Sequence, residues 1–148
     1  MSYQERQSLV SLISTILVFV LYSAFMAQRY PDAGEYSPEV FRFWGAFILI
    51  LIPVSIVTQI ILHIVFSIIN AIATREEESL IVDERDKLIE LKATRSGLYV
   101  FAVGVLLAMG SLVINMPPSA MFIILIIAGM LSSVISDALQ LVSYRRGL

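Results

Sequence analysis

The side chains best suited to proton or ion chemistry in this sequence are His63 and Asp137, each of which stands inside a long apolar run. Imidazole and carboxylate groups shielded from water change their protonation readily, so such a pair is a candidate proton relay. Both belong to polar stripes, because polar side chains recur around them every three or four residues and so share one helix face. The candidate residues of the two stripes are Gln59, His63, Asn70, Ser133, Ser136, Asp137 and Gln140.

Three interpretations of these stripes stay open from the sequence. The second and fourth spans are both expected to run from the outer to the inner side of the membrane. His63 lies seven residues before Asn70 near the inner end of the second span, and Asp137 lies seven before Tyr144 near the inner end of the fourth. The two side chains could therefore pair at a similar depth. The stripes can act as hydrogen-bonded glue between helices, at about 0.6 kcal/mol per bond, or as a path for protons or cations. The third interpretation is haem or metal ligation by His63 of two protomers. Since the chain has one histidine, no cysteine and no metal-ligand spacing, we expect no metal site and no cofactor.

The elements that carry these residues are four runs long enough to cross a membrane. Hydrophobic residues make up 58% of the 148-residue chain, above the share of about 45–50% in soluble domains. A helix of about 20 apolar residues spans the hydrocarbon core, and four segments qualify, at 9–27, 41–73, 97–116 and 118–144. We therefore predict an all-α fold, an integral membrane four-helix bundle in one domain over residues 1–148. Its packed centre should be the second, third and fourth spans, joined by a weaker polar face of the first at Ser8, Ser11, Thr15 and Tyr22.

The distribution of lysine and arginine predicts the orientation of the spans. Short loops rich in these residues stay in the cytoplasm. Eight of the ten bases lie at the N-terminus, in the middle loop and at the C-terminus, whereas the first loop with its flank holds Arg29 and Arg42 and the last loop, NMPPSA, holds none. We expect a multi-pass membrane protein with both termini in the cytoplasm.

A charged segment precedes the third apolar run and predicts an extension of that helix into the cytoplasm over about 80–96. At about 100° per residue, acidic and basic residues form separate stripes, and apolar residues form another at Leu80, Ile81, Leu88 and Leu91. This apolar stripe can lie on the bilayer surface or pack on a neighbouring helix. The charges can form a solvated, salt-bridged helix or a docking surface for a cytosolic partner or sister protomer. The docking candidates are Asp83, Glu84, Arg85, Asp86, Glu90 and Lys92.

The segment IVDERDKLIELKATRSGLYVF, residues 81–101, resembles the stretch before the third span of small, uncharacterised prokaryotic four-span membrane proteins, which carry an Asp-Glu-Arg motif followed by a basic and small-residue helix. The matching positions are Asp83, Glu84, Arg85, Lys92, Ala93 and Arg95. The segment covers about a seventh of the chain. Those families have no assigned activity, so the resemblance implies a four-span layout and an inner-membrane setting without any catalytic residue. Some members look like membrane companions of helix-turn-helix regulators, which favours an interaction role.

Motifs of common enzyme classes are absent from the sequence. It contains no Gly-rich phosphate loop, Gly-x-Ser-x-Gly elbow, His-Glu-x-x-His motif or paired carboxylates, and its net charge of -2 does not suit a nucleic-acid partner. We predict a non-enzymatic membrane interaction or regulatory subunit that docks a partner through the charged helix. The alternative is a small proton- or ion-coupled transporter or channel with Asp137 and His63 as its titrating pair. Because four short spans enclose little volume, it would work as a homo-oligomer.

Overall fold

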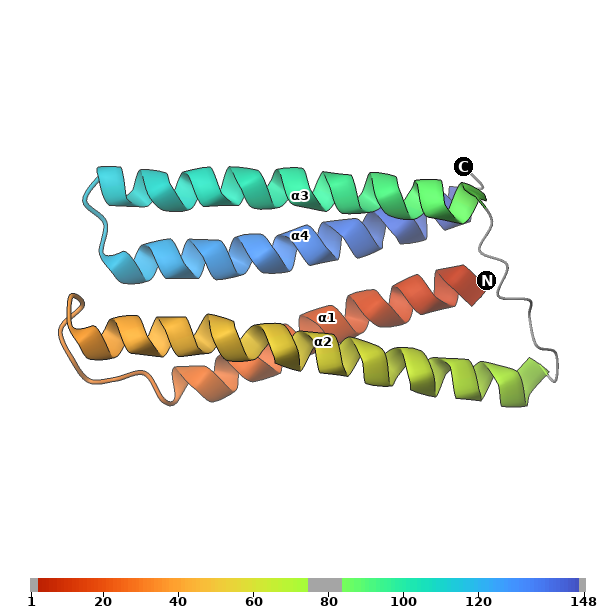
Figure 1. Ribbon diagram of the computed structural model, residues 1–148, viewed down its shortest axis with the longest axis horizontal. Coiled ribbons are helices and arrows are strands. Elements are labelled where there is room, and N and C mark those ends of the chain that lie inside the picture. Colours follow the sequence, from red (N-terminus) through yellow and green to blue (C-terminus); the bar gives the residue numbers. More distant parts are fainter. Residues whose placement is uncertain (1–2, 75–83, 147–148) are drawn as a thin grey trace.

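Four long helices account for the described part of the chain, which in the computed structural model comprises residues 3–74 and 84–146. They are α1 (Tyr3–Ala27), α2 (Pro38–Thr74), α3 (Glu84–Val113) and α4 (Pro118–Arg146), and they run lengthwise in an elongated bundle (Figure 1). Each is long and apolar enough to cross a membrane. The predicted all-α fold with four candidate spans is therefore confirmed. Of the predicted charged helix, residues 80–83 lie outside the described residues, and the remainder begins α3.

Two neighbouring residues, Ser37 and Pro38, explain why α2 begins where it does. Proline suits the first helical position, where its missing N–H has no intrahelical acceptor, and Pro38 occupies that position. The hydroxyl of Ser37 accepts a hydrogen bond from the backbone N–H of Val40 at 3.4 Å. Ser37 therefore acts as the N-cap of this helix.

The turn between α3 and α4 ends the third helix earlier than the sequence predicts. Asn115 adopts the left-handed conformation, with φ 61°, and the N–H of Met116 donates to the carbonyl of Ser111 at 3.0 Å. This is the Schellman arrangement, which closes a helix with a left-handed residue. The third helix thus ends at Val113 rather than at residue 116, while the fourth begins at Pro118 as predicted.

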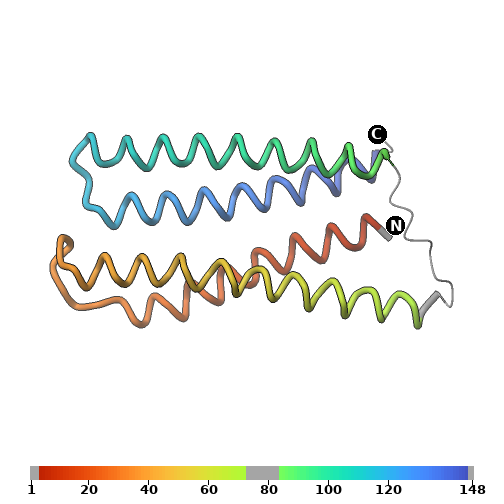
Figure 2. The backbone as a smooth tube through the Cα atoms, in the orientation of Figure 1, coloured from red at the N-terminus to blue at the C-terminus, as the bar shows by residue number. Residues whose placement is uncertain are grey.

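The packing of the bundle is organised around α4. Along its length α4 packs on α3 and on α1, and α1 in turn packs on α2, which it crosses at an angle (Figure 2). Within the described residues, α2 and α3 make no contact with each other. The expected centre of second, third and fourth spans is therefore wrong, because α1 rather than α3 is the neighbour shared by α2 and α4. The polar face of α1 explains this placement, since it bonds to both of those helices.

Small residues allow α3 and α4 to approach closely. The buried residues of α3 include Ala93, Gly97, Gly104, Ala108 and Ser111, which recur on the face toward α4. A Cβ at Gly97 would lie 2.8 Å from the carbonyl oxygen of Ser132, whose hydroxyl donates to the Gly97 carbonyl at 2.8 Å. Small residues at such seams let helix backbones meet without a hydrophobic driving force from water.

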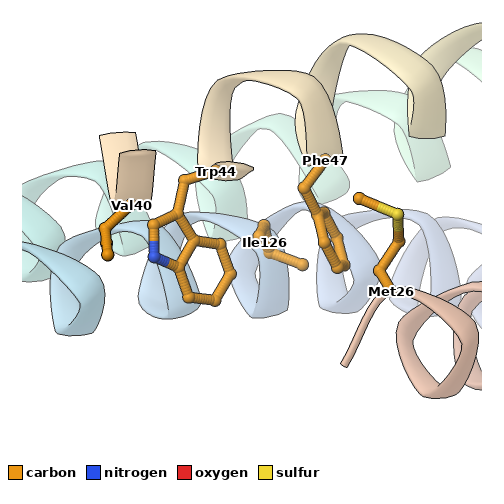
Figure 3. Packing of buried hydrophobic residues seen from close by; sticks show 5 residues of the cluster. All are labelled: Met26, Val40, Trp44, Phe47 and Ile126. Carbon is orange, nitrogen blue, oxygen red and sulfur yellow. The ribbon is translucent and has the colours of Figure 1, made fainter. Parts of the chain in front are cut away.

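Aromatic packing closes the bundle at the end that holds the two loops 28–37 and 114–117. Met26, Val40, Trp44, Phe47 and Ile126 bring together the end of α1, the first turns of α2 and the first half of α4 (Figure 3). The Trp44 ring stacks on Phe122 with centroids 6.0 Å apart and an interplanar angle of 6°. Its indole N–H donates to the Ser119 hydroxyl at 3.3 Å.

The opposite end of the bundle holds the functional candidates. The start of α1, the end of α2, the start of α3 and the end of α4 lie there (Figure 1). The polar stripes and the charged start of α3 therefore belong to the same half of the molecule.

Candidate functional site

A polar cluster joins α1, α2 and α4, and its centre is the carboxylate of Asp137. Oδ2 of this residue accepts hydrogen bonds from Ser11 Oγ at 3.2 Å and from Thr15 Oγ1 at 3.3 Å. Ser11 and Thr15 are four residues apart on α1, so both hydroxyls lie on the helix face toward α4. The weaker polar face predicted on the first span thus joins the interior through these two residues.

Gln59 of α2 connects the same hydroxyls from the other side. Its Oε1 accepts from Ser11 Oγ at 3.3 Å, and its Nε2 donates to Thr15 Oγ1 at 3.1 Å. The Ser11 hydroxyl has one proton and two acceptors in reach, so it can donate to Gln59 or to Asp137 at a given moment. We call Ser11, Thr15, Gln59 and Asp137 the Asp137 cluster. All four side chains are half-buried.

His63 lies beside this cluster and has a different partner. Its Nδ1 accepts a hydrogen bond from Nε2 of Gln7 at 2.8 Å, which requires the tautomer with its proton on Nε2. The structure therefore gives His63 and Asp137 different hydrogen-bond partners. Their similarity in membrane depth stays a prediction. Antiparallel helices explain the arrangement, since Gln7 and Ser11 on α1 face His63 and Gln59 on α2 at matching four-residue steps.

A small recess opens between α1 and α2 next to the Asp137 cluster. It has room for about one water molecule. Its polar lining comes from Gln7, Ser11, Gln59 and His63 and its apolar lining from Val10, Leu62 and Phe66. Ser11 and Gln59 belong both to the recess and to the Asp137 cluster, so the recess borders the cluster.

Two other residues of the predicted stripes, Ser133 and Ser136, have neighbours outside this cluster. Ser133 is exposed and donates to the carbonyl of Gly129 on its own helix at 3.3 Å. Ser136 faces α3, since its Cβ lies 3.4 Å from the position of a Cβ on Gly97. Asn70 and Gln140 are half-buried. The polar stripe of α4 is therefore divided between two neighbours, with Ser136 toward α3 and Asp137 toward α1.

Among the polar residues that sequence reasoning missed are Gln7 and Ser132. Gln7 precedes the apolar run, but it lies four residues before Ser11 and so continues the same helix face. Ser132 is bonded to Gly97 across the α3 and α4 seam. The spacing of Gln7 carried a usable signal, whereas the role of Ser132 depends on how closely the two helices approach.

The charged start of α3 presents a second candidate surface. Its face toward α4 consists of Ile89 and Ala93, which are 6% and 3% exposed. Leu88 and Leu91 belong to the apolar stripe predicted from the sequence, and they are 56% and 65% exposed. The packing face of this helix is therefore not the predicted stripe, because the small Ala93 allows a closer approach to α4 than the leucines would.

Most of the predicted docking residues are accessible. Glu84, Arg85, Glu90 and Lys92 are exposed, and Asp86 is half-buried. Tyr144 of α4 is within electrostatic range of Arg85, Asp86 and Glu90. Asp83 lies outside the described residues. The accessible charges and the leucines Leu88 and Leu91 form the surface that we call the α3 surface.

Comparisons of the chain with protein-family models, with curated proteins and with solved structures give no match. The resemblance of residues 81–101 to prokaryotic four-span proteins stays a prediction. Within the described ranges, no group of three or more His, Asp or Glu side chains is placed to hold a metal ion.

Proposed function

We propose that this protein is a non-enzymatic interaction or regulatory subunit of the cell inner membrane, and that the α3 surface docks a helix of a protein partner. Both termini and the start of α3 lie in the cytoplasm in this proposal. The orientation is supported by the position of the arginine and lysine residues, five of which lie between residues 75 and 95.

The length of α3 supports a cytoplasmic extension. The helix has 30 residues, which at about 1.5 Å each make about 45 Å, compared with about 30 Å for the hydrocarbon core. Its first three turns carry Glu84, Arg85, Asp86, Lys87, Glu90, Lys92 and Arg95. Charged side chains are costly inside the bilayer, so these turns are the part that projects from it.

The observation that carries the proposal is the exposure of Leu88 and Leu91 among these charges. An apolar pair three residues apart on one helix face is the kind of anchor that helix-in-groove recognition uses. Glu84, Arg85 and Lys92 around it can select a partner of complementary charge. In contact with water, this apolar area would favour a binding partner that covers it.

The test is native mass spectrometry of the full-length tagged protein, gently extracted from the membrane that normally expresses it. We expect a stoichiometric second polypeptide on the wild type. The bound polypeptide should be lost when Arg85 and Lys92 are both changed to Glu, and also in the charge-neutral variant Leu88→Gln with Leu91→Gln.

The matched control reverses two arginines at the other end of the bundle. Arg29→Glu with Arg42→Glu changes the same number of charges far from the α3 surface and should retain the partner. If the second polypeptide stayed bound to both α3 variants, or if the wild type carried only copies of itself, the docking proposal would be overturned.

A second function is supported by the hydrogen bonds that link Asp137 to Ser11 and Ser11 to Gln59, next to Gln7 and His63. Two neighbouring hydrogen-bonded groups of this kind suit a small proton- or ion-coupled transporter that works as a homo-oligomer. Asp137→Asn should then abolish flux into proteoliposomes while the bundle stays folded. Unchanged flux in that variant would exclude the relay.

A further inference from the structure

We propose that the Asp137 cluster binds a monovalent metal cation, with Na⁺ as its ligand of choice. The ligands would be the carboxylate of Asp137, the hydroxyls of Ser11 and Thr15, and the side-chain carbonyl of Gln59. They come from three different helices, and their neighbouring polar atoms lie 3.1–3.3 Å apart. Binding would therefore join α1, α2 and α4 at one point.

The chemistry of the donor set favours a hard cation. All four side chains supply oxygen, the ligand atom that hard cations such as Ca²⁺ and Mg²⁺ prefer over nitrogen and sulfur. His63, whose nitrogen would favour a transition metal, is bonded to Gln7 instead. The proposed site thus uses oxygen ligands and excludes His63, whereas the haem or metal site considered in the sequence analysis used His63 as its ligand.

The spacing of the oxygens matches a coordination shell. The Ser11 oxygen lies 3.2 Å from Asp137 Oδ2 and 3.3 Å from Gln59 Oε1, and the Thr15 oxygen lies 3.3 Å from Asp137 Oδ2. Hydrogen bonds from hydroxyls to carboxylates are shorter, at about 2.5–2.7 Å. Adjacent oxygens around an ion with bonds of about 2.4 Å are separated by about 3.4 Å in octahedral geometry. The oxygen spacing of the cluster, which its direct hydrogen bonds occupy in this structure, is therefore also compatible with the coordination shell of an ion such as Na⁺.

The charge of the cluster selects the valence of the ion. Asp137 supplies one negative charge, and the hydroxyls and amide supply none. A carboxylate within an apolar span is costly without a compensating charge. One monovalent cation neutralises it, whereas divalent sites are commonly built from several carboxylates.

The recess between α1 and α2 borders the cluster, since Ser11 and Gln59 line it together with Gln7 and His63. In this proposal, water and an ion reach Ser11 and Gln59 from that side. This inference deepens the second proposed function by naming its ion, and it does not depend on the docking proposal. Its test measures binding, so failure of binding and failure of transport are separate results.

The experiment measures thermal unfolding of the full-length protein in lipid nanodiscs, with NaCl replaced by choline chloride at constant ionic strength. A ligand that binds the folded state raises the unfolding temperature in a saturable manner. We expect such a rise with Na⁺ for the wild type, no rise for Asp137→Asn, and binding weakened about tenfold or more for Thr15→Val. The last variant keeps the side-chain shape, so it stays informative if Asp137→Asn does not fold.

Matched controls carry the same substitutions at hydroxyls bonded to their own helix. Thr58 donates to the Val54 carbonyl at 2.8 Å, and Ser14 donates to the Ser11 carbonyl at 2.8 Å. Thr58→Val and Ser14→Ala should keep the full Na⁺ response, while Ser11→Ala should reduce it. An equal unfolding temperature in NaCl and choline chloride would overturn the inference. So would an unaltered Na⁺ response in Thr15→Val, or a larger response to Ca²⁺ than to Na⁺.

Discussion

Gly104 of α3 lies so close to Ala128 of α4 that a methyl group at position 104 would overlap the methyl group of the alanine. Gly104→Ala should therefore destabilise the hairpin of α3 and α4, by about 1–3 kcal/mol as for other overpacked interiors. The measurement is the free energy of unfolding in mixed micelles. Gly104→Ala combined with Ala128→Gly should recover most of the loss, because the methyl group is moved across the contact rather than added.

The control for this prediction is Gly110 on the same helix. A Cβ at Gly110 meets nothing within 4 Å, so Gly110→Ala should leave the stability unchanged or raise it slightly. Equal losses at both glycines would show that the close contact is not the cause.

Trp44 is expected to report the packing of the aromatic end of the bundle. It is the single tryptophan of the chain and is 8% exposed. Its fluorescence should be blue-shifted and weakly quenched by aqueous acrylamide. Phe122→Ala removes the stacked ring, which should increase quenching and cost at least about 1 kcal/mol of stability, whereas Phe101→Ala on the exposed side of α3 should not alter the emission. Strong quenching in the wild type would contradict the cluster shown in Figure 3.

Ser23 of α1 has a buried hydroxyl with no hydrogen-bond partner among the described residues. Since an unsatisfied buried group costs about 1–3 kcal/mol, Ser23→Ala should stabilise the protein by about 1 kcal/mol. Ser14→Ala on the same helix removes a hydroxyl that is bonded to a carbonyl and should give no gain. Thermal unfolding of both variants in one detergent distinguishes a specific effect from a general preference for alanine.

The proposed orientation can be tested with single cysteines, because the chain has none of its own. A membrane-impermeant maleimide applied to intact cells should label Tyr36→Cys, which replaces a side chain 72% exposed. It should label Leu91→Cys only after the membrane is permeabilised. The reverse pattern would place both termini outside the cytoplasm.

Substitutions on the two faces of the charged part of α3 should change the free energy of unfolding by different amounts. Ile89 is buried against α4 and Leu88 is exposed. Ile89→Ala should cost about 2 kcal/mol or more in unfolding free energy, and Leu88→Ala should cost little. A larger loss for Leu88→Ala in the isolated protein would mean that the predicted apolar stripe is the packing face after all.

Much of the fold and part of the candidate site followed from the sequence. Apolar runs of sufficient length predict helices wherever no water is present to satisfy the backbone, and polar residues at helical spacing predict faces that avoid lipid. Ser11, Thr15, Gln59 and Asp137 were all recognised as polar interior candidates in this way. The hydrogen-bond partners of each residue could not be predicted from the sequence. A polar helix face must contact other polar groups, but the sequence does not say which helix supplies them.

The sequence by itself thus determined four apolar helices, the turns that separate α1 from α2 and α3 from α4, and the polar residues that cannot face lipid. Only the tertiary structure decided that α4 is the central helix, that Gln7 rather than Asp137 bonds to His63, and that Ile89 and Ala93 form the contact with α4. The physical reason is that these helices are apolar on nearly every side. Where lipid solvates any apolar face equally well, the close fit of small residues and the direction of a few hydrogen bonds select the neighbours.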